Sequence, residues 1–175
     1  MKIFISGMPA SGKSTFGKSL SGHLDLHFYD LDELVEAKGR TIDELFAESE
    51  AAFRAVEKQT LSEFLEQHGN ESFCLALGGG TLELDGVAQL LKEQGILIYL
   101  DVDIDEIGER LSQKSESERR PMFIDLNSEQ IGSKLKKIWD LRKAKYWKSH
   151  IITGVQEVQE PELLTKRIEL FTKFG

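Results

Sequence analysis

Short apolar runs alternate with longer amphipathic segments along the chain, and this alternation predicts the elements of the fold. The apolar runs are bounded by turn residues, which is typical of buried strands in a parallel sheet. We expect five strands, at Lys2–Ser6, His27–Tyr29, Phe73–Leu77, Ile96–Leu100 and His150–Thr153. The amphipathic segments predict helices at Lys13–Leu24, Thr41–Ser49, Glu50–His68, Gly86–Lys92, Ile104–Leu111, Ser128–Trp147 and Pro161–Phe171. Strands separated by helices indicate an α/β fold, with helices on both faces of the sheet.

Length and composition fit a single domain over residues 1–175. A chain of 175 residues with 40% hydrophobic content can bury a sizeable core. The net charge of −8 argues against a broad surface for nucleic acid or anionic membrane. No apolar run reaches the length of a membrane-spanning helix, and the N-terminal MKIFISG lacks a signal-peptide pattern. We expect a cytoplasmic protein whose anionic ligands must meet local positive charge.

The lone cysteine and the histidines offer little chemistry. Cys74 lies inside the apolar run FCLAL, which favours a packed core thiol without a catalytic role. The four histidines are scattered without the spacing of metal ligands, so a zinc site has little support.

The strongest chemical signal is the segment GMPASGKS, which matches GxxxxGK[ST] between a predicted strand and a predicted helix. A chance glycine-rich turn is the alternative, but strand, loop, lysine and helix follow one another in the required order. Glycines let successive amides point at one phosphate cluster, and the helix adds its positive N-terminal end. The lysine reaches the β- and γ-phosphates of ATP, and the serine hydroxyl suits Mg²⁺. The predicted nucleotide-binding residues here are Gly7, Ala10, Ser11, Gly12, Lys13, Ser14 and Thr15.

Two aspartates follow the second predicted strand. Alternation along the chain would let Asp30 and Asp32 flank one site while Leu31 packs away. Asp30 is then placed to serve Mg²⁺, and Asp32 to contact an acceptor hydroxyl and take its proton. The alternative for Asp32 is a structural one, as the N-cap of a helix beginning at Glu33.

Arginine is sparingly used, with seven residues against 15 lysines. Its planar guanidinium grips a carboxylate or phosphate through two parallel hydrogen bonds, which lysine cannot do. Arg54 and Arg142 are candidates for such a grip, and Glu57 lies on the same helical face as Arg54. A surface ion pair of little consequence is the alternative for Arg54. Arg120, directly before Pro121, suits a lid that neutralises charge on the transferring group.

Two loops complete the predicted site. The segment Ser112–Pro121 is polar and charged, which fits either an ordinary solvated loop or a lid, and we place the lid at about 111–125. The run LGGG follows the third predicted strand, where parallel sheets bind ligands beyond their carboxyl ends. Glycine amides there can donate to an anion, although a simple strand-to-helix turn would use the same residues.

The chain resembles the shikimate kinase family, within the nucleoside-monophosphate-kinase-like branch of P-loop proteins. The resemblance lies in the order of seven segments, GMPASGKST, YDLD, TIDELFAESEAAFRAVE, LGGG, IYLDV, ERRP and LRKAKYW. The resemblance implies a three-layer α/β/α P-loop fold with a five-stranded parallel sheet in the order 2-3-1-4-5, a lid and a substrate-binding region at about 31–60. It also implies transfer of the γ-phosphoryl group of ATP, with Mg²⁺, to the 3-hydroxyl of shikimate.

The resemblance further assigns roles to individual residues. Asp30 would associate with Mg²⁺ and Asp32 with the hydroxyls of shikimate. Arg54 and Arg142, helped by the backbone amide of Gly79, would hold the shikimate carboxylate. For the nucleotide, the resemblance implies that Arg120 meets the phosphates from the lid and that Arg110 stacks against adenine.

Three details depart from the family pattern. The segment ESEAAFR lacks a glycine before Arg54, RPMF stands where RPLL is common, and Ala10 replaces a frequent P-loop glycine. Related enzymes keep the phosphate machinery and change acceptors, so a kinase of another polyol acid such as gluconate is an alternative. A non-catalytic nucleotide-binding module is the second alternative. We expect the protein to be a monomer.

Overall fold

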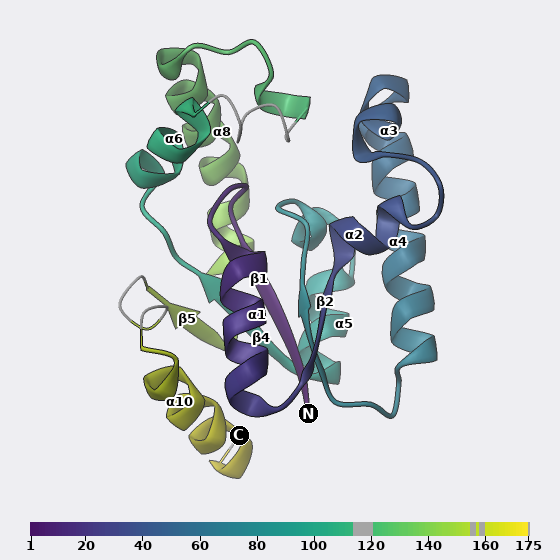
Figure 1. The fold of residues 1–175 in the computed structure, drawn as a ribbon, viewed down its shortest axis with the longest axis vertical. Coiled ribbons are helices and arrows are strands. Elements are labelled where there is room, and N and C mark those ends of the chain that lie inside the picture. Colours follow the sequence, from purple (N-terminus) through teal and green to yellow (C-terminus); the bar gives the residue numbers. More distant parts are fainter. Residues whose placement is uncertain (114–120, 155–156, 158–159, 175) are drawn as a thin grey trace.

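The computed structural model describes residues 1–113, 121–154, 157 and 160–174. Its centre is a parallel sheet of five strands in the order β2-β3-β1-β4-β5 (Figure 1). The strands are β1 (Lys2–Gly7), β2 (His27–Asp30), β3 (Phe73–Ala76), β4 (Ile96–Leu100) and β5 (Ile151–Thr153). Both the five strands and their order were predicted, and the structure confirms them.

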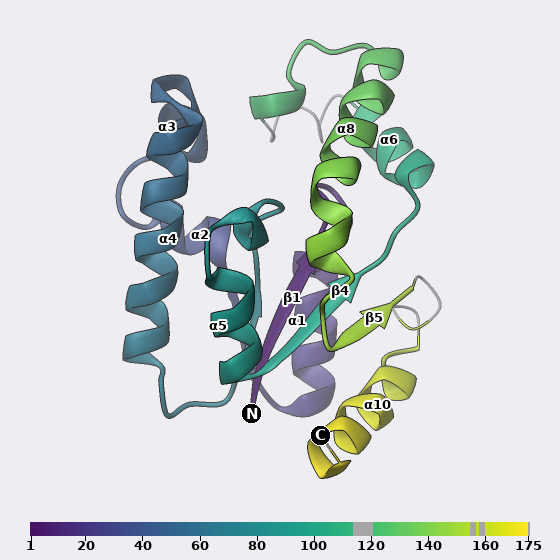
Figure 2. The same cartoon turned by 180° about the vertical axis from the view of Figure 1, so that it is seen from behind.

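Helices surround the sheet and complete a three-layer α/β/α arrangement. Each helix predicted from the sequence is present, with ends displaced by at most a few residues. The helices are α1 (Lys13–Leu24), α2 (Leu31–Glu36), α3 (Ile42–Glu48), α4 (Glu50–Gln67), α5 (Val87–Gln94), α6 (Ile104–Ser112), α8 (Ser128–Tyr146) and α10 (Pro161–Phe174), with short 3₁₀ turns η1 (Thr81–Glu83) and η2 (Pro121–Phe123). Figure 1 shows α1 over one face of the sheet, and Figure 2 shows α5 and α8 over the other.

The core forms around β1, the central strand, because it is covered on both faces. Ile3, Phe4 and Ile5 are fully buried, and the parallel register pairs Ile3 with Cys74 of β3 and with Ile96 of β4. Burial of such a run is the main favourable term in folding. Since every strand is parallel, all the carboxyl ends meet at one edge of the sheet, and the loops that follow β1, β2 and β3 are brought together there.

Cys74 is a core thiol, as predicted. It is fully buried, and burial raises its pKa to about 12, so that it stays protonated at neutral pH. Across the part of the chain that the structure describes, no group of three or more His, Cys, Asp or Glu side chains could hold a metal ion. The same residues include no helix long and apolar enough to cross a membrane.

Candidate active site

The loop between β1 and α1 forms a tight cradle. A Cβ on Gly7 would lie 2.8 Å from the Ser11 hydroxyl oxygen, and Gly12 has a φ of 91°, which a side chain rarely tolerates. Ala10 also has a left-handed φ, of 58°, at the position where a glycine is frequent. The departure at Ala10 therefore leaves an alanine in a conformation that favours glycine, at a cost in backbone strain.

The cradle ends at the first turn of α1, where charge is arranged for an anion. No side chain caps the N-terminus of α1, and its first turn carries no acidic residue. Lys13 folds back over the loop, where its Nζ donates to the carbonyls of Gly7 at 3.2 Å and Met8 at 2.9 Å. Backbone amides, a helix N-terminus and an ammonium group around one hollow fit the phosphates of a nucleotide.

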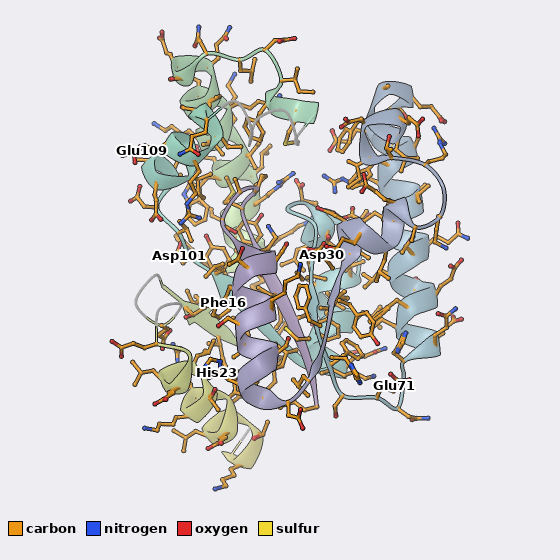
Figure 3. All side chains as sticks on the ribbon, in the orientation of Figure 1. Phe16, His23, Asp30, Glu71, Asp101 and Glu109 are labelled. Carbon is orange, nitrogen blue, oxygen red and sulfur yellow. The ribbon has the colours of Figure 1, made fainter. Side chains whose placement is uncertain are left out.

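Asp30 joins this cradle to the next strand. Figure 3 labels Asp30 at the carboxyl end of β2, where its Oδ2 accepts a hydrogen bond from the Ser14 hydroxyl at 2.5 Å. Its Oδ1 accepts from the backbone amide of Asp32 at 3.0 Å and so caps α2. A hydroxyl and a carboxylate held side by side are oxygen ligands of the kind that Mg²⁺ prefers. The residues present therefore fit the predicted metal ion.

Asp32 reaches the site by a different route from the one predicted. It does not extend the alternation of β2, because the chain turns into α2 at Leu31. Nor does Asp32 cap a helix beginning at Glu33, since Asp30 caps the helix two residues earlier. The N-cap alternative is thus wrong, and so is strand alternation as the cause of the arrangement. The predicted arrangement itself is present, because Asp30 and Asp32 line one cavity while Leu31 is fully buried. Asp32 is instead in the first turn of α2, which still places it near the same edge of the sheet.

Two neighbouring cavities open at this edge, and Asp32 lines both. The first, the P-loop cavity, is lined by Ala10, Gly12, Lys13, Ser14, Thr15, Asp30, Asp32 and Arg110, among others. The second, the acceptor cavity, is lined by Asp32, Arg54, Arg142, the three glycines Gly78, Gly79 and Gly80, and an apolar wall that includes Phe53 and Met122. The predicted acceptor residues from four separate segments thus meet around one hollow.

Arg54 enters the acceptor cavity as part of a buried network. Its Nη1 donates to Glu57 at 2.7 Å, and Glu57 is completely buried and also accepts from the Thr81 hydroxyl at 2.6 Å. Burial alone would lower the pKa of Arg54, but the charges and hydrogen bonds of Glu57 and Glu50 outweigh it and raise the pKa. Arg54 is therefore charged and fixed, and the alternative of a loose surface ion pair is wrong.

Arg142 reaches the same cavity from α8. Its Nε and Nη2 both contact one carboxylate oxygen of Glu83, at 2.7 and 2.6 Å, and its Nη1 donates to the Gly79 carbonyl at 3.0 Å. Only 6% of the Arg142 side chain is exposed. A guanidinium has five N–H donors, so these contacts do not use all of them and leave a donor for a carboxylate in the cavity. The Gly79 carbonyl thus faces Arg142, whereas the sequence suggested a role for the Gly79 amide alone.

Two predicted nucleotide residues have different outcomes. Arg110 lines the P-loop cavity, where its Nη1 donates to the Ala10 carbonyl at 3.2 Å and its Nη2 pairs with Glu106. Its stacking on adenine stays a prediction. Arg120 lies outside the described residues, as do residues 114–119 of the predicted lid. Met122, toward the far end of the lid, lines the acceptor cavity.

Three residues that shape the site were not predicted from the sequence. They are Thr81, Glu83 and Tyr146, whose hydroxyl donates to the Gly79 carbonyl at 2.6 Å. Thr81 and Glu83 follow the glycine run by one to three positions, and no spacing rule connects them to Glu57 or Arg142. Tyr146 stands in the segment LRKAKYW, four residues after Arg142, so helical spacing could have placed both on one face of α8.

The P-loop follows the central strand of a parallel sheet, and Asp32 lines both the P-loop cavity and a separate cavity with two arginines. This arrangement defines an ATP-dependent kinase of small molecules. Comparison with known proteins narrows this class. A sequence model of the family "Shikimate kinase" matches residues 9–172. The shikimate kinase of Chloroherpeton thalassium is 34% identical over 177 residues, covering 95% of this chain and 91% of the relative. That of Chlorobaculum parvum is 34% identical, with coverage of 95% and 91%.

Solved structures agree with the sequence comparison. The structure of shikimate kinase from Bacteroides thetaiotaomicron has a TM-score of 0.85 at 25% identity and covers 95% of this chain and 98% of its own. The Acinetobacter baumannii enzyme in complex with shikimate has a TM-score of 0.84 at 26% identity, covering 99% and 95%. The chain belongs to the shikimate kinase family. It is accordingly an ATP-dependent kinase that phosphorylates a hydroxyl group of shikimate, with ATP and Mg²⁺ as the donor complex.

Proposed function

We propose that the P-loop cavity binds ATP with Mg²⁺ and that the acceptor cavity holds shikimate with its 3-hydroxyl toward Asp32. The observation that carries this assignment is the position of Asp32, which lines both cavities. A carboxylate at that junction accepts the hydrogen bond of the attacking hydroxyl. The guanidinium groups of Arg54 and Arg142 hold the shikimate carboxylate at the other end of the cavity, through parallel hydrogen bonds.

The residues work mainly by position and charge. The reaction forms a bond between the acceptor oxygen and the γ-phosphorus, and it breaks the bond between that phosphorus and the leaving ADP oxygen. Ser14 and Asp30 would hold Mg²⁺, which when bound screens the negative charge of the phosphates. Lys13 and the amides at the start of α1 stabilise the charge on the phosphoryl oxygens. The acceptor hydroxyl donates its hydrogen bond to Asp32. Asp32 then either takes up the proton or only orients the hydroxyl while the proton is lost.

The remaining assignments follow from the same arrangement. We assign residues 1–175 to one kinase domain, with the substrate-binding region at about 31–60 and the lid at about 111–125 carrying Arg120. The described end of that lid supports this, because Met122 already lines the acceptor cavity. The net charge of −8 supports a protein without a nucleic-acid partner, and we further propose a cytoplasmic monomer.

An assay of ADP release tests the proposed acceptor. With ATP and Mg²⁺ present, we expect release to depend on added shikimate and to be low without it, since a bound acceptor and a closed lid exclude the water that would otherwise compete. Gluconate serves as the competing acceptor. A preference for gluconate would overturn the choice of shikimate, and ATP binding without phosphorylation of either compound would favour a non-catalytic module.

The glycine run offers a test of Arg54. A Cβ on Gly80 would lie 2.2 Å from Nη2 of Arg54, whereas the backbone of Gly80 has a negative φ of −112° that alanine adopts easily. We therefore expect Gly80→Ala to displace the guanidinium of Arg54. The KM for shikimate should rise about tenfold, which corresponds to the loss of one charged hydrogen bond. Steady-state kinetics measures this. Gly22→Ala is the control, because a Cβ there meets nothing within 4 Å, and equal KM values for the two variants would contradict the role of Arg54.

A further inference from the structure

The hydroxyl group of Tyr146 lies between the P-loop and the glycine run of the acceptor cavity. It donates to the Gly79 carbonyl at 2.6 Å and lies 3.3 Å from the Gly7 carbonyl, so one proton is shared unequally between them. Gly7 closes β1 at the start of the P-loop, and Gly79 lines the acceptor cavity. Figure 2 shows α8, which ends at Tyr146, running down to the carboxyl ends of β1 and β4. A single hydroxyl therefore connects the two loops that hold the two substrates.

Each of these carbonyls also holds a cation of the proposed site. The Gly7 carbonyl accepts from Nζ of Lys13 at 3.2 Å, and the Gly79 carbonyl accepts from Nη1 of Arg142 at 3.0 Å. The contacts form a continuous series, from Lys13 through Gly7, Tyr146 and Gly79 to Arg142. At one end is the lysine that meets the phosphates, and at the other the arginine that meets the acceptor carboxylate.

The ring of Tyr146 is held firmly enough to fix this series. Tyr146 is 1% exposed, and its ring stacks on Tyr99 with centroids 4.7 Å apart and planes inclined by 6°. The stacked ring of Tyr99 is what supports Tyr146, whereas the Tyr99 hydroxyl donates to Asp101 at 3.0 Å, after the end of β4. Burial raises the pKa of Tyr146 to about 12, so the hydroxyl keeps the proton that it donates throughout the neutral range.

We propose that Tyr146 is a positioning residue for phosphoryl transfer, which sets the spacing between the P-loop and the acceptor glycines through its hydroxyl. The proposal rests on the proposed function, because it takes Lys13 and Arg142 as the groups that hold donor and acceptor. Transfer between two bound substrates depends steeply on their separation, since a displacement of about 1 Å can cost about 10²-fold in rate. Binding of each substrate alone depends on its own cavity and not on that separation.

The test is Tyr146→Phe, which removes only the shared hydroxyl. The variant keeps the stacked ring, and both carbonyls keep a donor in Lys13 and Arg142, so the fold should survive. We expect kcat with shikimate to fall about tenfold or more while the KM values for ATP and shikimate change little, because alignment is lost and binding is kept.

Tyr99→Phe is the matched control, since it removes a hydroxyl from the stacked neighbour without touching either loop. Its kcat should stay near that of the wild type, and melting temperatures of both variants show whether stability alone has changed. Equal kcat for the two variants, or a lower melting temperature of Tyr146→Phe with kcat retained, would overturn the positioning role. A wild-type protein that does not phosphorylate shikimate would instead contradict the proposed function, so the two failures are distinguishable.

Discussion

Replacing Arg142 by alanine is expected to raise the KM for shikimate by about 10²-fold, because truncating one partner of a buried charged pair costs roughly 2–5 kcal/mol. The KM for ATP should change little, since Arg142 lines the acceptor cavity and not the P-loop cavity. The loss has two parts. The guanidinium no longer donates into the cavity, and the carboxylate of Glu83 remains without its partner and repels the acceptor carboxylate.

Two further variants separate charge from geometry. Arg142→Lys keeps a positive charge, but an ammonium group cannot contact Glu83 and Gly79 and also donate two parallel hydrogen bonds to the acceptor carboxylate. The variant should therefore recover only part of the affinity for shikimate. Arg40→Ala is the control for loss of an arginine, because Arg40 is half exposed and pairs with Glu48 away from the cavity. A KM for shikimate that is normal in Arg142→Ala would mean that the carboxylate binds elsewhere.

The fold could be predicted from the sequence because its strands are encoded locally. The run ILIYL is buried throughout, and in KIFIS the apolar residues Ile3, Phe4 and Ile5 are fully buried in the sheet. Helix starts were also local, as the capping box between Thr41 and Glu44 shows. Short helices are harder, and α2 entered only as an alternative, a helix beginning at Glu33, because its six residues carry too little periodicity to stand out.

The contacts within the site could be predicted only where one motif contains both partners. The P-loop is of this kind, since its lysine contacts carbonyls five and six residues away. Arg54 could likewise be linked to Glu57 by helical spacing. By contrast, Arg142 meets Glu83 across 59 positions, and Tyr146 meets Gly7 across 139. Contacts of that separation are set by the packing of α8 on the sheet, so no spacing rule could have found them.

The arginines of the acceptor cavity are paired with carboxylates of the protein, in a chain that carries many negative charges. The protein has a net charge of −8 and binds, in ATP and shikimate, two anionic substrates. Arg54 and Arg142 are each held by a carboxylate of the protein, Glu57 and Glu83, before any substrate arrives. Such pairing fixes the direction of each guanidinium, so less conformational entropy is lost on binding. The acceptor then meets donors that are already aligned.

Replacing Asp32 by asparagine is expected to lower kcat by about 10²-fold or more, the range typical of a lost acid–base or orienting group. Asparagine keeps the shape and one acceptor oxygen but can neither take up a proton nor carry a negative charge. The KM for ATP should change less than kcat, because Asp32 also lines the P-loop cavity but Lys13, Ser14 and Asp30 are unchanged. The measurement is kcat as a function of pH, for the wild type and the variant.

The shape of that pH profile separates the two roles open to Asp32. If Asp32 takes the proton, the wild-type rate falls at acid pH as the carboxylate becomes protonated, and the variant loses that dependence along with most of its rate. If Asp32 only orients the hydroxyl, the variant keeps a substantial rate, since its amide oxygen still accepts. Glu33→Gln is the matched control, a carboxylate one residue along α2 whose side chain is 71% exposed and pairs loosely with Lys18. A kcat for Asp32→Asn equal to that of Glu33→Gln would remove Asp32 from the reaction, and the carboxylate shared by the two cavities would then have only a structural role.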